Sequence, residues 1–274
     1  MRKLNIIGTD ISATNYEEVV NAVGNWLSQA ALGVEKGAKY ICLTSVHGIV
    51  TARRDPELRS ALNGADVATP DGMPVVWALR SFGAVTQQRV YGPALMLWLC
   101  EAAVCHRYRI FLYGGRPEVL AALCEKLNTR YPELMIVGTY SPPFRPLTTT
   151  EDDHVKQMIR GSGAHLVFVG ISTPKQEKWM AAHRRDFPGK VLVGVGAAFD
   201  FHAKRVRQAP GWMRQAGLEW LFRLLMEPAR LWKRYLLVTP QFLPLWALQK
   251  MGLLHERQDS RSHSIDQRVF KKSA

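Results

Sequence analysis

Short apolar runs recur along the first 200 residues and alternate with longer segments of helical periodicity. Each run is four to six residues long, bounded by polar or turn-forming residues, and predicts a β-strand. The predicted strands cover residues 4–7, 40–44, 66–69, 109–113, 135–138, 165–170 and 191–195.

Between these runs, apolar positions recur every three or four residues, as they do on one face of a helix. Near-continuous apolar strands separated by helices are typical of a mainly parallel sheet that is covered on both faces. We therefore expect a Rossmann-like α/β fold. The clearest predicted helices cover residues 16–31, 93–105, 117–130, 151–160 and 175–185.

The pattern changes after Phe201, where no further strand is indicated. The sequence predicts a helix over residues 210–235, with Pro228 as a break inside it, and another over residues 240–254. The expected organisation is an α/β core (residues 1–202), a C-terminal helical appendage (residues 203–256) and a disordered tail (residues 257–274).

The net charge of +13 is spread unevenly along the chain of 274 residues. Residues 204–274 contain 14 Lys or Arg and 5 Asp or Glu, a balance of +9. Uneven basicity indicates a polyanionic partner, such as nucleic acid, an anionic membrane surface or a phosphorylated substrate. No known nucleic-acid-binding motif accompanies this charge. The appendage instead interleaves its basic residues with Trp212, Trp220, Trp232 and Trp246, a pattern that suits a membrane interface unless the rings dock on the core.

The location of the protein is indicated by what its sequence lacks. No apolar run approaches the ~18 residues that span a bilayer, and the N-terminal apolar stretch is too short for a signal peptide. The four cysteines, Cys42, Cys100, Cys105 and Cys124, show no metal-binding spacing. We expect a cytoplasmic protein with free thiols.

Ligands of open parallel sheets bind outside the carboxyl ends of the strands, and this is where the unusual polar residues of the core gather. A carboxylate such as Asp71 can act there as a general base, although Pro70-Asp71-Gly72 is also ordinary turn chemistry. Gly114-Gly115 can cradle a phosphate or form a plain turn. The other polar residues at predicted strand ends are Thr44, Ser45, His47, Lys175, Gln176 and Asp200.

Acidic residues in two places are explained by helix starts. Glu151-Asp152-Asp153 reads as an acidic first turn of a helix, and Glu177 as a carboxylate that complements a helix dipole. No metalloenzyme motif is present, so we expect no metal and no cofactor. Gly194-Val195-Gly196 resembles the start of a dinucleotide fingerprint, but it lacks the third glycine and follows the last predicted strand.

Seven motifs in series resemble the WecG/TagA/CpsF bacterial glycosyltransferases, glycosyltransferase family 26. The resemblance covers roughly residues 6–245, and the serial order of the motifs makes it far more specific than any one of them. The motifs are Thr44-x-Val46-His47, Arg53-Arg54-Asp55-Pro56-Glu57, Ala65-Asp66-Val67-x-x-Pro70-Asp71-Gly72, Gly114-Gly115, Pro174-Lys175-Gln176-Glu177, Gly194-Val195-Gly196-Ala197-Ala198-Phe199-Asp200-Phe201 and Gly217-Leu218-Glu219-Trp220-x-x-Arg223-Leu224-x-x-Glu227-Pro228.

The resemblance implies an inverting, metal-independent hexosyltransferase with the GT-E fold. Its implied donor is a UDP-sugar, UDP-N-acetylmannosamine in the best-known members, and its implied acceptor is an undecaprenyl-diphosphate-linked sugar for surface or exopolysaccharide synthesis. Such an enzyme is expected on the inner face of the cytoplasmic membrane. By position, the resemblance implies Asp71 as catalytic base, Thr44 and Gln176 as residues that line the site, Asp200 as a contact of the nucleotide, and Arg223 and Arg230 as contacts of the diphosphate. We expect Thr44, Ser45, His47, Gln176, Arg223 and Arg230 to bind substrate, and Gly114, Gly115, Lys175 and Asp200 to bind the nucleotide.

The chain departs from the family pattern at Ser45, where Asn is common, at Gly92-Pro93-Ala94 and at Gln208-Ala209-Pro210. These departures affect the expected sugar more than the expected reaction. Two rival classes remain: a nucleotide-dependent oxidoreductase, for which the first predicted strand carries no fingerprint, and a basic nucleic-acid-binding protein.

Overall fold

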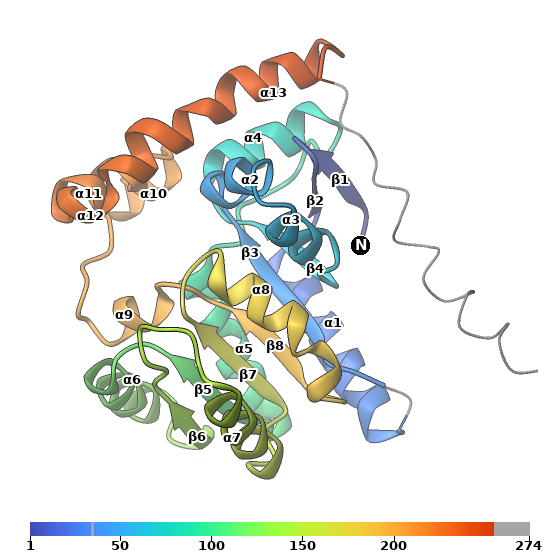
Figure 1. The fold of residues 1–274 in the computed structure, drawn as a ribbon, viewed down its shortest axis with the longest axis vertical. Coiled ribbons are helices and arrows are strands. Elements are labelled where there is room, and N and C mark those ends of the chain that lie inside the picture. The colour runs from blue at the N-terminus through green and yellow to red at the C-terminus, as the bar shows by residue number, and fades with distance from the viewer. Residues whose placement is uncertain (34–35, 255–274) are drawn as a thin grey trace, which may run out of the picture.

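A parallel six-stranded sheet forms the centre of the computed structural model, which describes residues 1–33 and 36–254 (Figure 1). The predicted tail, residues 257–274, lies outside the described residues. The strand order is β4-β3-β8-β7-β5-β6, and every neighbouring pair is parallel. The six later predicted strands and the Rossmann-like fold are therefore confirmed. The strands are β3 (Lys39–Thr44), β4 (Val67–Pro70), β5 (Arg109–Gly114), β6 (Met135–Tyr140), β7 (Leu166–Gly170) and β8 (Val191–Gly194).

Helices cover both faces of the sheet because successive strand residues point to opposite sides. In β7, Leu166 and Phe168 pack into one core layer, whereas Val167 and Val169 pack into the other. The first layer includes α1 (Tyr16–Ala31), α5 (Gly92–His106), α6 (Pro117–Arg130) and α9 (Ala198–His202). The second includes α3 (Pro56–Asn63), α7 (Thr149–Gly161) and α8 (Lys175–Ala182).

The first predicted strand does not join the parallel sheet. β1 (Lys3–Ile6) instead pairs with β2 (Thr9–Ser12) in a separate antiparallel hairpin. Ile7 and Gly8 both take positive φ, 52° and 80°, which is the geometry of a tight turn between two antiparallel strands. The hairpin packs against α2 (Val46–Ala52) and α4 (Met73–Ser81), in a third apolar cluster beside the sheet.

The predicted helix over residues 210–235 is broken into shorter pieces. Gly217, with φ of 74°, separates the first two, and Pro228 starts a new helix after Glu227 has left the helical conformation. The pieces are α10 (Gly211–Gln215), α11 (Glu219–Met226) and α12 (Pro228–Trp232), followed by a π-helical stretch (Lys233–Val238), a 3-10 turn (Thr239–Gln241) and α13 (Phe242–Lys250). The predicted helix over residues 175–185 likewise ends at Ala182 and continues as a 3-10 turn (Arg184–Asp186).

The last helix, α13, is anchored to the core near α2 and α4 (Figure 1). Phe242 is only 1% exposed and belongs to the same apolar cluster as the hairpin residue Ile6. Gln249 accepts a hydrogen bond from the backbone N–H of Ile7 at 2.9 Å and donates one to the carbonyl of Asn5 at 2.9 Å. Trp246 also docks on the core, where its indole N–H donates to the hydroxyl of Ser81 at 3.1 Å.

This anchoring predicts that Phe242→Ala destabilises the whole protein. The substitution leaves a cavity in a buried cluster, so the free energy of unfolding measured by urea denaturation should fall by about 3–5 kcal/mol. Leu243→Ala is the matched control, because the neighbouring Leu243 is 55% exposed and its loss should change stability by less than about 0.5 kcal/mol. Equal effects of the two substitutions would contradict the anchoring.

Candidate active site

A cavity of about 440 Å³ opens at the carboxyl ends of β3, β4, β7 and β8. The helices that follow β7 and β8 lie on opposite faces of the sheet, which leaves a crevice between two adjacent strands. Residues of α11 and α12 line the same cavity. The site therefore combines the α/β core with the appendage.

A second cavity, of about 610 Å³, lies beside the start of α1 and includes Trp98. It is the larger of the two, but it contains none of the residues that the sequence singles out for chemistry. Volume alone does not identify an active site, whereas convergent charged groups at strand ends do. We therefore take the cavity at the strand ends as the candidate active site.

Asp71 stands directly after β4, where the chain turns into α4. Its backbone N–H donates to the carbonyl of Thr44 at 2.9 Å, which holds this turn against the end of β3. Gly72 then takes a φ of 133°, a conformation that favours glycine. Burial raises the pKa of the Asp71 carboxyl, although the nearby Arg89 opposes the rise. A carboxylate with a raised pKa is a better proton acceptor, as a general base requires.

Arg89 and Glu219 lie beside Asp71, and neither has a role predicted from the sequence. Arg89 Nη2 contacts Asp71 Oδ1 at 3.1 Å, while Arg89 Nη1 contacts Glu219 Oε2 at 2.8 Å. The Tyr91 hydroxyl donates to Glu219 Oε1 at 3.2 Å, and its ring lies 4.2 Å from the Arg89 guanidinium. Because Glu219 begins α11, these contacts connect the core to the appendage at the candidate base.

Gln176 and Glu177, at the start of α8, form a buried polar cluster on another wall. Gln176 Oε1 accepts from the backbone N–H of Gly196 at 3.0 Å, and Gln176 Nε2 donates to Glu177 Oε1 at 2.9 Å. The hydroxyl of Thr173 donates to the same Glu177 oxygen at 2.8 Å. Glu177 is 1% exposed, so the interpretation based on a helix dipole alone misses its main role. It holds Gln176, which in turn holds the loop after β8.

Three arginines of the appendage, Arg223, Arg230 and Arg234, line the cavity as well. Burial lowers the pKa of Arg234, and charge repulsion from Arg223 and Arg230 lowers it further. Arg230 is paired with Glu227 at 2.7 Å, and Arg234 donates to the hydroxyl of Ser45 at 3.5 Å. Mutually repelling guanidinium groups favour an anionic ligand, and their planar forks match a diphosphate.

His47 and Asp200 are two further titratable residues in the lining of the cavity. Burial and the adjacent Arg234 lower the pKa of His47 to about 4, so the imidazole is neutral at pH 7. Burial raises the pKa of Asp200, and Arg230 opposes this rise. With a ligand beside the arginine cluster, the neutral imidazole can donate or accept a hydrogen bond, and the Asp200 carboxylate can accept one.

The structure brings seven of the predicted site residues into this cavity and leaves four outside its lining. Thr44 is buried beneath the Asp71 turn. The Gly115 backbone N–H already donates to the carbonyl of Gly170 at 3.2 Å, so it is not free for a phosphate. Inside the lining are Ser45, His47, Asp71, Gln176, Asp200, Arg223 and Arg230; outside are Thr44, Gly114, Gly115 and Lys175.

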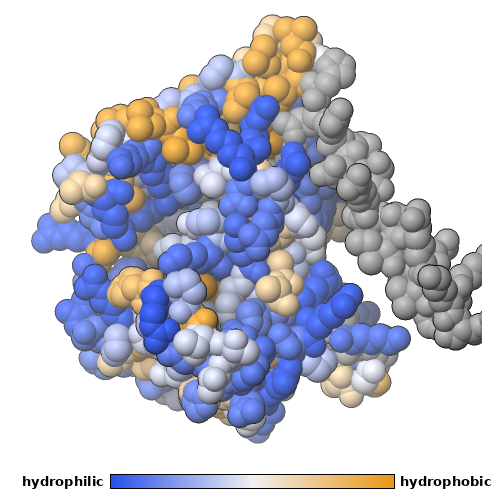
Figure 2. Space-filling view, viewed as in Figure 1, coloured by the Kyte–Doolittle hydropathy of each residue, from blue (hydrophilic) through white to orange (hydrophobic). Residues whose placement is uncertain are grey.

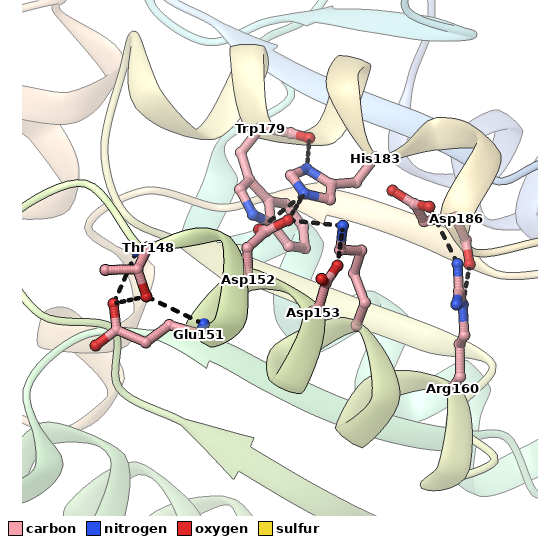
Figure 3. A network of polar contacts seen from close by, with 9 residues as sticks. Thr148, Glu151, Asp152, Asp153, Arg160, Trp179, His183 and Asp186 are labelled. Carbon is pink, nitrogen blue, oxygen red and sulfur yellow. Dashed lines mark hydrogen bonds and ion pairs between the residues drawn. The ribbon is translucent and has the colours of Figure 1, made fainter.

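The acidic triplet Glu151-Asp152-Asp153 forms the start of α7, as predicted (Figure 3). Thr148 and Glu151 form a reciprocal capping box, and Asp152 accepts from His183 Nε2 at 3.0 Å (Figure 3). Lys156 pairs with Asp152 and Asp153 at 2.8 and 2.9 Å. Among residues 1–33 and 36–254, no group of three His, Cys, Asp or Glu side chains is placed to hold a metal ion.

The chain matches the model of the Glycosyl transferase WecG/TagA/CpsF family over residues 4–256. It is 31% identical over 241 residues to the N-acetylglucosaminyldiphosphoundecaprenol N-acetyl-beta-D-mannosaminyltransferase of Bacillus spizizenii, and the match covers 88% of each chain. A protein of the same name from Bacillus subtilis strain 168 is 33% identical over 199 residues, which cover 73% of this chain and 75% of the relative. The family match includes the core and the described appendage.

The lowered pKa of His47 predicts a measurable effect of pH on stability. Between pH 6.5 and about 4, the unfolded chain binds a proton at this residue that the native protein does not bind. Stability is therefore lost as the pH falls through this window. His47→Gln should reduce the loss between pH 7 and pH 5, measured by urea denaturation, by on the order of 1 kcal/mol. The exposed His154→Gln is the matched control, and an equal effect there would refute the assignment.

Proposed function

This chain belongs to the WecG/TagA/CpsF family of glycosyl transferases, and on that premise we propose that it transfers a sugar from a UDP donor to an undecaprenyl-diphosphate-linked sugar. The enzyme is a glycosyltransferase. Both relatives are named for transfer of an N-acetylmannosaminyl group to N-acetylglucosaminyldiphosphoundecaprenol. N-acetylmannosamine or another hexose is therefore the sugar that we propose is transferred.

One observation carries this proposal: a half-buried carboxylate with a raised pKa and a cluster of arginines line the same cavity. Asp71 takes the proton of an acceptor hydroxyl while that oxygen attacks the anomeric carbon of the donor sugar. The bond from this carbon to the UDP oxygen breaks, and its electron pair leaves with UDP. Attack opposite to the leaving group inverts the configuration at the anomeric carbon.

The arginines supply what the leaving group needs. Arg223 and Arg230 contact the donor diphosphate and neutralise the charge that develops as UDP departs, a role that a metal ion fills in other enzymes. Asp200, on the same wall, accepts hydrogen bonds from the nucleotide. Ser45, His47 and Gln176 contact the sugars. The binding roles of Thr44, Gly114, Gly115 and Lys175 stay predictions from the sequence.

The reaction is tested with the purified enzyme, a panel of UDP-sugars and a lipid-diphosphate-linked N-acetylglucosamine, with mass spectrometry of the product. We expect transfer from one UDP-sugar of the panel in the presence of excess EDTA. Absence of any transfer would overturn the proposed reaction. Activity that EDTA removes and Mg²⁺ or Mn²⁺ restores would overturn the metal-free mechanism.

Asp71→Asn should lower the transfer rate by about 10²-fold or more, because the amide cannot accept the proton. The amide has nearly the same shape, so UDP affinity, measured by calorimetry, should stay within about twofold. Asp186→Asn is the matched control: Asp186 pairs with Arg160 outside the cavity, and its loss should leave transfer unchanged. Near-wild-type turnover in Asp71→Asn would remove Asp71 from the mechanism.

A second part of the proposal is that the appendage lies on an anionic membrane surface on the cytoplasmic side. Figure 2 shows hydrophobic residues gathered over the appendage helices, along the top and upper left of the view. The Nζ atom of Lys233 lies 5.6 Å from the Trp232 ring, a basic-aromatic pairing that suits an interface with anionic lipid. The most exposed apolar side chains of the appendage are Trp212, Leu225, Met226, Leu236, Leu237, Leu243, Met251 and Leu253.

The proposed contact with the lipid surface is peripheral. No helix within residues 1–33 and 36–254 is both long and apolar enough to cross a bilayer. Of the four appendage tryptophans, Trp246 is held against Ser81, whereas Trp212, Trp220 and Trp232 are at least 39% exposed. Trp212 and Trp232 are available to the interface, whereas Trp220 also lines the cavity.

Trp232→Ser should weaken binding to vesicles that contain phosphatidylglycerol by roughly tenfold, because a buried aromatic side chain is worth about 1.5–3 kcal/mol. The matched control is Trp98→Ser on α5, since Trp98 and Trp232 are both 42% exposed. Vesicle sedimentation measures the affinity of each variant. Equal weakening by the two substitutions would show that the appendage is not the membrane-binding surface.

A further inference from the structure

The guanidinium of Arg89 is shared between two carboxylates that come from different parts of the fold. One terminal nitrogen contacts Asp71 Oδ1 at 3.1 Å, and the other contacts Glu219 Oε2 at 2.8 Å. Within the described chain, no side chain or backbone group donates a hydrogen bond to Asp71 Oδ2. One oxygen of the proposed base is therefore paired and the other is open.

This shared arrangement is not the one that Arg89 would adopt with Asp71 alone. An arginine beside a single carboxylate favours a bidentate contact, with two parallel hydrogen bonds to its two oxygens. Such a contact would occupy Asp71 Oδ2 and would stabilise the ionised form, which lowers the pKa of the carboxyl. A base held in that way is both blocked and weakened.

Glu219 is itself held so that it can compete for the guanidinium. The Tyr91 hydroxyl donates to its other oxygen, Oε1, at 3.2 Å, and the side chain is only 14% exposed. Arg89 also rests on the Tyr91 ring at 4.2 Å. The position of Glu219 is thus fixed relative to Arg89, and Arg89 Nη1 is directed toward Glu219 and away from Asp71.

We propose that Glu219 is a positioning residue for the proposed base: by holding one arm of Arg89, it limits Arg89 to one oxygen of Asp71 and leaves Oδ2 for the acceptor hydroxyl. This inference rests on the proposed role of Asp71 in the transfer. Because Glu219 begins α11, Arg89 is limited to one oxygen of Asp71 only when the appendage is docked beside the base. Docking of the appendage thereby completes the core's own catalytic group.

The charges around Asp71 give the sign of the expected effect. Arg89 from the core and Arg223 and Arg234 from the appendage favour the ionised carboxylate, whereas Glu219 disfavours it. The phenols of Tyr16 and Tyr91 also face Asp71, and burial raises the pKa of both, so they are neutral at neutral pH. Removal of the Glu219 charge should lower the pKa of Asp71.

The experiment measures this pKa in four proteins: wild type, Glu219→Gln, Arg89→Lys and the double variant. Titration of ¹³C-labelled aspartate carboxyls by NMR reports it directly, with the Asp71 signal assigned by its loss in Asp71→Asn. We expect Glu219→Gln to lower the pKa of Asp71 by about one unit when Arg89 is present. In the Arg89→Lys background the shift should be smaller, because only the direct repulsion by Glu219 is then lost and a single ammonium has no second arm to redirect.

Transfer assays supply a second readout. In Glu219→Gln, the acid limb of the rate against pH should move to lower pH with the pKa, and the rate on its plateau should fall by about tenfold because the base is weaker and partly blocked. The affinity for UDP should stay within about twofold. The matched control is Glu57→Gln, an exposed carboxylate paired with Lys178, which should change neither the pKa of Asp71 nor the rate.

Three outcomes would overturn the proposal. The pKa of Asp71 could stay unchanged or rise in Glu219→Gln, or it could fall equally in both backgrounds, as displacement of the appendage or direct repulsion by Glu219 alone would produce. Unchanged transfer in Glu219→Gln would also refute it. The NMR titration needs no substrate, so an enzyme that transfers no sugar from the tested panel would contradict the proposed function without affecting this result.

Discussion

The candidate site depends on the burial of Phe242 against the core. This contact, the two hydrogen bonds of Gln249 and the indole hydrogen bond of Trp246 together hold α13 on the hairpin and on α2 and α4. α11 and α12 precede α13 in the same segment of the chain, so the anchoring of α13 also restrains them at the cavity. The arginines that line the cavity are therefore positioned by burial along this segment, of Phe242 at its far end and of Leu231 and Tyr235 beside Arg230 and Arg234, because burial of apolar surface supplies most of the energy for docking.

Charged groups in the cavity are arranged at some expense to stability. Arg223 and Arg234 each have a buried Nε without a hydrogen-bond partner among the described residues, and they repel one another. Glu177 is also buried, and its Oε2 has no hydrogen-bond partner among the described residues. Such groups are fixed before a ligand arrives, so they need little rearrangement when charge develops on a leaving group. A protein selected only for stability would not retain them.

Much of the fold could be predicted from the sequence, because apolar runs between amphipathic helices leave few alternatives to a parallel sheet. The alternation of Leu166, Val167, Phe168 and Val169 between two core layers is the physical basis of that signal. The first predicted strand is present as β1, but it lies outside the parallel sheet, because a short apolar run does not say with which partner a strand pairs. Its antiparallel pairing depends on the positive φ of Ile7, which a β-branched residue rarely adopts.

The candidate site could be predicted in part. The rule that ligands bind at strand ends led to Asp71, Gln176 and Asp200, and the family resemblance added Arg223 and Arg230. Arg89, Glu219 and Arg234 were assigned no role, because each acts through contacts between segments far apart in the chain. Arg89 lies in a loop without a motif, and a charged loop residue is usually solvated. Only the fold reveals that its guanidinium lies between two carboxylates.

Helix α11 joins the two proposed activities of the appendage. Glu219 and Arg223, four residues apart, share one face of this helix and line the cavity. Leu225 and Met226 near its end are 70% and 52% exposed. A helix whose one face completes the site and whose other side chains suit lipid brings the proposed membrane surface close to the cavity. An acceptor whose lipid chain stays in the bilayer then needs to present only its sugar to Asp71, so the anchor and the site are most effective on the same short segment.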